Sequence, residues 1–105
     1  MIPFANGACS LVYLNRIVET FDLDASENLF KESRRILNPK GAILLASSDH
    51  GSSVSQAWLQ ENGFNIVSSD GEKISRRFYY VPRISDVVKK EKLFLAVKGI
   101  EDAHH

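Results

Sequence analysis

The hydrophobic positions of this chain gather in short uninterrupted runs that polar or amphipathic segments separate. Residues 11–14 and 42–46 are two such runs, and residues 66–67 and 93–97 give two more. A continuous apolar run of this length is typical of a strand buried on both faces, as in a parallel sheet. The pattern therefore predicts a sheet whose first strands are buried on both sides.

A helix is predicted over residues 24–37, between the first two apolar runs. Its apolar side forms one stripe at helical spacing, made by Leu29, Phe30, Ser33, Ile36 and Leu37. Asp24 and Glu27 have the spacing of a capping box. In this motif the first side chain accepts a hydrogen bond from a free backbone N–H of the first helical turn, and the second side chain reaches back to the backbone N–H of the first residue. Pro39 cannot continue a helix, and Gly41 allows a left-handed turn into the next strand.

A second, shorter helix is predicted after the polar loop that follows residue 46. Ser53 and Gln56 again have capping-box spacing. Trp58 is interpreted as an anchor that packs this helix onto the sheet. Gly63 is expected to end the helix in a left-handed conformation, with Phe64 as its hydrophobic partner.

The last third of the chain has the features of consecutive strands. Asp70-Gly71 is a strong hairpin-turn dipeptide, and residues 78–81 are rich in β-prone aromatics until Pro82. We therefore predict an α/β fold of one domain over residues 1–105. Its sheet is expected to be parallel at its start with an antiparallel finish, and to carry about two main helices.

The composition of the chain limits the class of protein to which it can belong. The chain has 105 residues, of which 44% are hydrophobic and 25% charged, as is ordinary for a globular domain. No apolar run approaches the roughly 20 residues that span a bilayer, so no membrane association is expected. The N-terminus does not have the features of a signal peptide. The single cysteine, Cys9, excludes an internal disulfide and offers no metal-ligand pair. A reduced, cytoplasmic protein is the prediction.

Charge is unevenly distributed, although the formal net charge is zero. Residues 1–72 hold five basic and nine acidic residues, whereas residues 73–98 hold eight basic residues against Asp86 and Glu91. Cations alternate with aromatic rings in the second segment, at Arg76, Arg77, Tyr79 and Arg83. Such a mixture can hold phosphates and stack bases. The pattern favours instead a solvated edge hairpin with its rings in the core and its basic residues outside.

Asp49 and His50 lie in a serine-rich loop after the second predicted strand. An Asp-His pair beside serines can indicate nucleophilic catalysis. A polar loop that caps the next helix explains the same residues, and this interpretation is preferred. His50 has no second His or Cys at ligand spacing, so a metal site is not expected.

An ordered set of short motifs carries a family resemblance. Pro3-Phe4 precedes the first apolar run, Asn15 ends it, Glu19 follows, and residues 34–41 read Arg-Arg-Ile-Leu-Asn-Pro-Lys-Gly. This order resembles the second half of the catalytic domain of class I S-adenosylmethionine-dependent methyltransferases, in the form L-P-F…D-x-V…N…E-H…R-x-L-x-P-G-G. The resemblance implies the later part of a Rossmann-like sheet, beginning at its fourth strand.

The resemblance also implies where S-adenosylmethionine would lie if a partner completed its site. Phe4 would correspond to the position beside the adenine. Leu14, Asn15 and Arg16 would face the methionine part and the substrate. The chain departs from the family pattern at four places: Cys9 and Ser10 replace Phe-Asp, Thr20 replaces His, and Lys40 replaces a glycine.

The cofactor-binding half of the family pattern has no counterpart in these 105 residues. No Gly-x-Gly-x-Gly turn is present, and every glycine is isolated. Such a turn allows the backbone to approach a cofactor closely, which any side chain obstructs. The chain by itself is therefore expected to bind the cofactor weakly or not at all.

The missing first strand of the family would pair with the strand at residues 11–14. Leu11 to Leu14 would then form an open hydrophobic edge, which proteins rarely leave uncovered. A homodimer through this edge is favoured; a complementary chain or the chain's own N-terminal residues are alternatives. The leading functional hypothesis is a methyltransferase-like binding or assembly module, or half of a split enzyme. The alternatives are an active S-adenosylmethionine-dependent methyltransferase completed by a second chain, and a small nucleic-acid-binding protein that uses residues 73–92.

Overall fold

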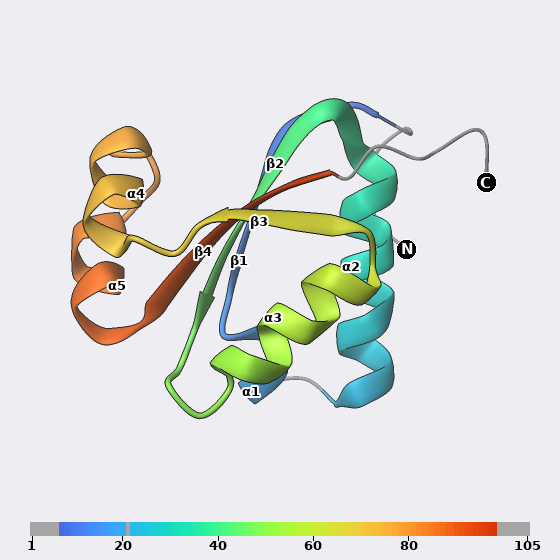
Figure 1. Ribbon diagram of the computed structural model, residues 1–105, viewed down its shortest axis with the longest axis horizontal. Helices are drawn as coiled ribbons and strands as arrows, with labels where there is room; N and C mark the ends of the chain where they lie inside the picture. The colour runs from blue at the N-terminus through green and yellow to red at the C-terminus, as the bar shows by residue number, and fades with distance from the viewer. Residues whose placement is uncertain (1–6, 21, 99–105) are drawn as a thin grey trace.

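The computed structural model describes residues 7–20 and 22–98 (Figure 1). Helices separate the first three strands along the chain, and two short helices precede the last strand. The elements in chain order are β1 (Cys9–Asn15), α1 (Ile17–Thr20), α2 (Leu23–Ile36), β2 (Leu37–Ser47), α3 (Ser52–Glu61), β3 (Phe64–Ser68), α4 (Gly71–Arg77), α5 (Ile84–Lys90) and β4 (Lys92–Lys98). No helix among these is long and apolar enough to cross a membrane.

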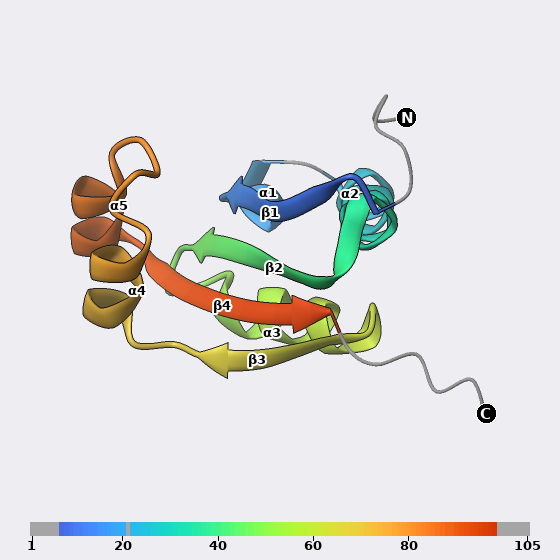
Figure 2. The ribbon, with the colours of Figure 1, turned by 90° about the horizontal axis from the view of Figure 1, so that it is seen from above.

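The four described strands form one mixed sheet in the order β1-β2-β4-β3, seen from above in Figure 2. β1 and β2 are parallel, and their register is regular from Leu11 opposite Ala42 to Asn15 opposite Ala46. β4 lies antiparallel between β2 and β3. The predicted sheet, parallel at its start with an antiparallel finish, is confirmed. β1 forms one edge of it.

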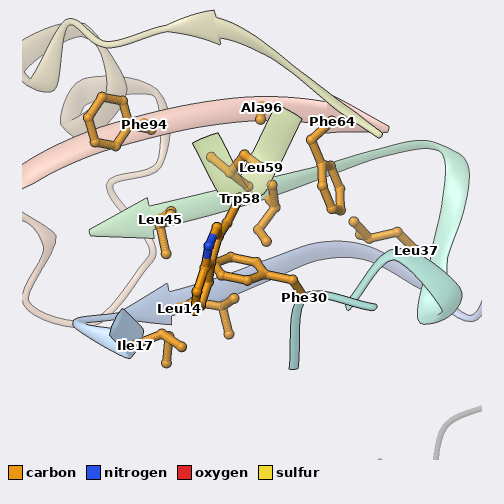
Figure 3. Close-up of a cluster of buried hydrophobic side chains, with 11 residues drawn as sticks. Leu14, Ile17, Phe30, Leu37, Leu45, Trp58, Leu59, Phe64, Phe94 and Ala96 are labelled. Atoms are coloured by element: carbon orange, nitrogen blue, oxygen red, sulfur yellow. The ribbon is translucent and has the colours of Figure 1, made fainter. Parts of the chain in front are cut away.

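Each face of the sheet has its own hydrophobic core. Alternate residues of a strand point to opposite faces, so Ile43 and Leu45 pack with α2 and α3 while Leu44 and Ala46 pack with α4 and α5. The first cluster holds Phe30 and Trp58, whose rings meet edge to face with centroids 5.6 Å apart (Figure 3). Trp58 is therefore an anchor between helix and sheet, as predicted.

The predicted helix over residues 24–37 is present as α2, but its cap differs from the expected one. Asp22, not Asp24, is the N-cap residue, and its carboxylate accepts a hydrogen bond of 2.8 Å from the Ala25 N–H. Asp24 lies exposed in the first turn, where its charge still favours the helix dipole. Two aspartates two residues apart offer the same local chemistry, and the backbone conformation selects the first.

The segment after α2 corrects a second expectation. Gly41 does not take a left-handed conformation, and β2 begins directly at Leu37. The glycine is required by crowding instead, because a Cβ at this position would lie 2.8 Å from Leu37 Cδ2 and 3.0 Å from the Asn38 carbonyl oxygen. This crowding coincides with the register shift between β1 and β2, where the pairing moves from Leu37 to Ala42.

The second predicted helix is present as α3, again with a different start. Gly51 is its N-cap residue and provides no side-chain hydrogen bond, while Ser53 lies exposed inside the helix. The predicted capping role of Ser53 and Gln56 is therefore wrong. The end of the helix is as expected: Gly63 has a φ of +82° and Phe64 is buried.

The largest correction concerns residues 70–83, where a hairpin was predicted and the helix α4 followed by turns is found. Asp70 is the N-cap of α4, and its carboxylate accepts a 3.2 Å hydrogen bond from the Lys73 N–H. Asp-Gly therefore starts a helix here. Buried Ile74 of α4, its C-cap residue Phe78 and Val81 in the following turn pack against the sheet together with α5.

Candidate functional site

The candidate site lies where the carboxyl ends of β1 and β2 meet the beginning of β4. Asn15 pairs with Ala46, and Ser47 pairs with Lys92 in the neighbouring antiparallel ladder. Glu91, which directly precedes β4, is thereby brought to the end of β1. Open α/β sheets bind their ligands at this edge, beyond the carboxyl ends of parallel strands.

An open cleft of about 500 Å³ occupies this position between the end of β1 and α5. Its wall is mainly charged, with cations outnumbering carboxylates. The lining residues are Asn15, Arg83, Asp86, Val87, Lys89, Lys90 and Glu91. Asn15 is the only β1 residue among them, so the sheet contributes one side chain and α5 with its flanking residues contributes the rest.

An ion pair joins the two walls of the cleft. Arg16 Nη1 donates a hydrogen bond of 2.7 Å to Glu91 Oε1, and the Glu91 side chain is only 12% exposed. Among the described non-glycine residues, positive φ values occur at Arg16 (56°) and Arg83 (60°), and both residues border the cleft. A positive φ is uncommon for residues with a side chain, and such strain gathers at functional sites.

Two buried polar atoms beside the cleft have no hydrogen-bond partner within the described part of the chain. They are the phenolic oxygen of Tyr13 and Oε2 of Glu91. Burial raises the pKa of Tyr13 above its ordinary value of 10.0, and the Glu91 carboxylate raises it further. The Asn15 side chain acts in the opposite direction, although its geometry does not reach that of a regular hydrogen bond. The Tyr13 phenol is thus held neutral.

Tyr13→Phe is expected to change how stability depends on alkaline pH. The unfolded chain loses the Tyr13 proton near pH 10 while the folded chain keeps it, so the free energy of unfolding falls as pH rises through this range. Tyr13→Phe removes that contribution and gives a flatter profile between about pH 9.5 and 11. At pH 7 the substitution is neutral or stabilising by about 1 kcal/mol, because it removes an unsatisfied hydroxyl.

Urea unfolding followed by the fluorescence of Trp58, the only tryptophan, measures this profile. Tyr79→Phe is the matched control, since Tyr79 is 78% exposed and its hydroxyl is solvated. Identical pH profiles for Tyr13→Phe and the unmodified protein would contradict the role assigned to burial and Glu91.

The predicted cofactor-binding residues are only partly brought together. Phe4 lies outside the described residues. Leu14 is 8% exposed and packs into the core on the α2 side of the sheet. Asn15 and Arg16 are exposed at the cleft, one lining it and the other bridging to Glu91. Within the described part, Asn15 and Arg16 are therefore the predicted cofactor-binding residues that lie at the cleft.

Several residues of the cleft were not predicted, and one sequence signal could have identified them. Glu91 is 75 positions from Arg16, so no local motif connects them. However, an antiparallel last strand must start at the end where parallel strands finish. Residues just before the predicted strand at 93–97 therefore belong beside Asn15, and Lys89, Lys90 and Glu91 are among them.

The serine-rich loop has a structural role. Ser48 Oγ accepts a hydrogen bond from the Gly51 N–H, and Ser52 Oγ donates to the Asp49 carbonyl. Ser47 and Ser55 share a buried hydrogen bond of 2.9 Å. His50 is exposed and no hydrogen bond joins it to a serine of the described chain. These serines hold the loop together and do not cap α3, whose N-cap residue Gly51 provides no side-chain hydrogen bond. Among the described residues, no cluster of His, Cys, Asp and Glu could hold a metal ion.

Comparison with known proteins gives a consistent fold. No protein-family model matches the chain, and no curated protein matches it. Solved structures do match. The putative methyltransferase in complex with the Trm112 methyltransferase activator of Haloferax volcanii has a TM-score of 0.67 at 12% identity, covering 99% of this chain and 60% of that one.

Two further structures extend the comparison. The [4+2]-cyclase SpnF has a TM-score of 0.63 at 12% identity, with 96% of this chain and 53% of that chain covered. The M1.HpyAVI–SAM complex has a TM-score of 0.56 at 16% identity, with 94% and 46% covered. The chain thus spans about half the length of the structures it matches. Its sheet order, its mixed strand directions and this coverage agree: the chain has a partial Rossmann-like methyltransferase fold.

Proposed function

We propose that these 105 residues act as a methyltransferase-like binding or assembly module that is incomplete as a cofactor site by itself. This proposal rests on the position of β1, which forms an edge of the described sheet although its residues 11–14 are apolar. The matched structures are about twice as long. A second polypeptide segment placed along β1 would extend the sheet on the side where the family resemblance implies a further strand.

The two edges of the sheet differ in a way that supports this assignment. β3, at the other edge, has five residues and a register shift between Ile66 and Ser68. Short length and irregularity both protect an edge against pairing. β1 runs regularly from Leu11 to Asn15 with no charged residue or proline in that stretch. Leu11, Val12 and Tyr13 are only half-buried, so a partner strand would cover apolar surface as well as pair the backbone.

The cleft supports the incompleteness of the cofactor site. One wall of a cofactor site is present, since Asn15 lines the cleft from the end of β1. The facing wall is α5 with its N-cap residue, where Arg83, Lys89 and Lys90 carry positive charge. No glycine-rich turn is available among the 105 residues to approach a nucleotide through its backbone. The residues present therefore fit one side of S-adenosylmethionine only.

Cofactor completion by a second chain is the competing proposal, and the comparison supports it in one respect. The Haloferax volcanii neighbour is a putative methyltransferase seen in complex with an activator protein. A neighbour described as a [4+2]-cyclase shows that this fold also serves another reaction. Methyl transfer is consequently the more specific hypothesis, because it requires one particular reaction. Assembly through β1 does not depend on which reaction the fold serves.

The experiment measures mass and cofactor binding on the same sample. Light scattering of the purified chain at micromolar concentration is expected to give a homodimer, in which two β1 strands pair across a two-fold axis. Leu11→Lys is expected to give a monomer, because its ammonium group lies at the edge and repels its copy. Val67→Lys is the matched control: Val67 is 55% exposed on the opposite edge strand, and its replacement should leave the mass unchanged.

Calorimetric titration with S-adenosylhomocysteine then tests the incompleteness of the site. No binding at micromolar ligand is expected for the isolated chain. Micromolar binding that Asn15→Ala removes would contradict the proposal and favour a complete site within these residues. A monomer at all concentrations, unchanged by Leu11→Lys, would remove the homodimer and leave a complementary chain as the assembly partner.

A further inference from the structure

The α4–α5 unit, defined here as residues 71–90, lies together at one end of the sheet, away from α2 (Figures 1 and 2). It packs on the sheet through Ile74, Phe78, Val81 and Ile84, all at most 6% exposed. The residues between these anchors face solvent. The unit therefore presents a surface that the core does not use.

Two aromatic rings of this surface are exposed. Tyr79 is 78% exposed and Tyr80 is 61% exposed. Their ring centroids lie 5.8 Å apart, and Tyr80 also contacts the ring of buried Phe78 at 5.9 Å. The expectation that the rings of this segment turn into the core holds for Phe78 and is wrong for both tyrosines. Adjacent large exposed rings fixed on a buried third ring are ready-made stacking surfaces.

The same unit carries exposed positive charge. Arg76, Arg77, Arg83, Lys89 and Lys90 are all exposed. Within residues 7–20 and 22–98, no ion pair joins any of these five to a carboxylate, and Arg77 instead lies over the Phe78 ring at 5.1 Å. The opposing acidic residues of the unit are Glu72 and Asp86, both exposed. Cations therefore dominate the surface.

We propose that the α4–α5 unit is a binding surface for single-stranded nucleic acid, with Tyr79 and Tyr80 stacking on bases and the five cations contacting phosphates. Exposed rings beside unpaired cations match the two parts of a nucleotide. An acidic peptide would use the cations and leave the rings without a partner. A membrane surface would favour larger apolar side chains than two hydroxylated rings at the tip.

The surface continues into the cleft described above. Arg83, Lys89 and Lys90 belong to both, and Asn15 forms the opposite wall of the cleft. A strand held on the tyrosines would thus pass toward the carboxyl end of β1. The inference goes beyond the proposed function, because it requires neither a cofactor nor a partner on β1.

Fluorescence anisotropy with a labelled 12-nucleotide single strand tests the proposal, using RNA, DNA and the matching RNA duplex in parallel. Binding of a single strand is expected to be tighter than that of the duplex and to weaken with salt. Tyr79→Ala/Tyr80→Ala is expected to weaken single-strand binding by about tenfold or more, because each stacked base is lost. Arg76→Gln/Arg77→Gln is expected to weaken it and reduce its salt dependence.

The control variant Lys31→Gln/Lys40→Gln removes the same charge from exposed positions of α2 and β2. It should bind as the unmodified protein does. Circular dichroism establishes that each variant is folded. Absence of single-strand binding at low salt overturns the proposal, as does equal binding of the tyrosine variant. Binding of anionic phosphatidylserine vesicles without binding of either oligonucleotide would also overturn it, in favour of a membrane surface.

Discussion

Phe30→Ala is expected to cost about 3–5 kcal/mol of folding free energy, the range for removing a buried aromatic ring. Phe30 has no exposed surface, and its ring meets Trp58 edge to face at 88° between planes. It lies at the centre of the first core cluster, between α2, α3 and the sheet (Figure 3). Small domains have total stabilities of about 5–15 kcal/mol, so this loss approaches complete unfolding.

Thermal and urea unfolding measure the effect, with Trp58 as the fluorescent reporter of the same cluster. A midpoint lower by roughly 15 °C or more is expected, given about 4–8 °C per kcal/mol for a domain of this size. Val54→Ala on α3 is the control, since Val54 is 43% exposed and should change stability by less than about 0.5 kcal/mol. A change below about 1 kcal/mol for Phe30→Ala would mean that the site collapses around the missing ring.

The sequence predicts the central elements well because burial on both faces leaves a simple pattern. The runs at residues 42–46 and 93–97 lie within the two inner strands, β2 and β4. Their neighbours on each side require apolar residues at every position, so no other element fits. α2 is predicted for a related reason: its apolar stripe has a helical period over fourteen residues.

The α4–α5 unit was mispredicted because two local signals agree on the wrong element. Asp-Gly is a hairpin dipeptide, yet Asp70 also has the chemistry of an N-cap. Aromatics at 78–80 favour strands by propensity alone. The signal that opposes both is the four-residue spacing of Ile74 and Phe78, which lie in α4 and at its C-cap. In this segment tertiary packing against β2 and β4 decides the outcome.

Only the cleft residues at the end of β1 were predicted from the sequence, and the reason is physical. Asn15 and Arg16 follow a recognisable strand, so their place at the carboxyl edge is available from local pattern. Glu91 and the left-handed Arg83 depend on how a distant helix docks. The capping aspartate of α2 shows the same limit at short range. Asp24 has the capping-box spacing with Glu27, yet the backbone makes Asp22 the N-cap residue.

Docking of the α4–α5 unit connects the second core to both proposed surfaces. Its helices have seven residues each, too few to be stable alone in water. They therefore depend on apolar contacts with Leu44, Leu93 and Leu95 of the sheet. The cleft wall and the exposed tyrosines exist only while this packing holds.

Phe78→Ala is expected to release the unit from the sheet, with a cost of about 3–5 kcal/mol to its local packing. Phe78 is 6% exposed, lies under the Arg77 guanidinium and contacts the Tyr80 ring. Its removal leaves a cavity in the second core but does not touch the first, where Trp58 reports. Hydrogen exchange of residues 71–90 is expected to accelerate strongly, while Trp58 fluorescence stays native below the global midpoint.

Tyr79→Ala is the matched control for this measurement, because Tyr79 is the next residue and is 78% exposed. It should leave hydrogen exchange across the unit unchanged and stability within about 0.5 kcal/mol. Equal exchange rates in Phe78→Ala and the unmodified protein would show that Ile74, Val81 and Ile84 suffice to hold the unit. Loss of native Trp58 fluorescence at the same urea concentration as helix exchange would show that the two cores unfold as one, because a strand shared by both faces transmits the defect from one cluster to the other.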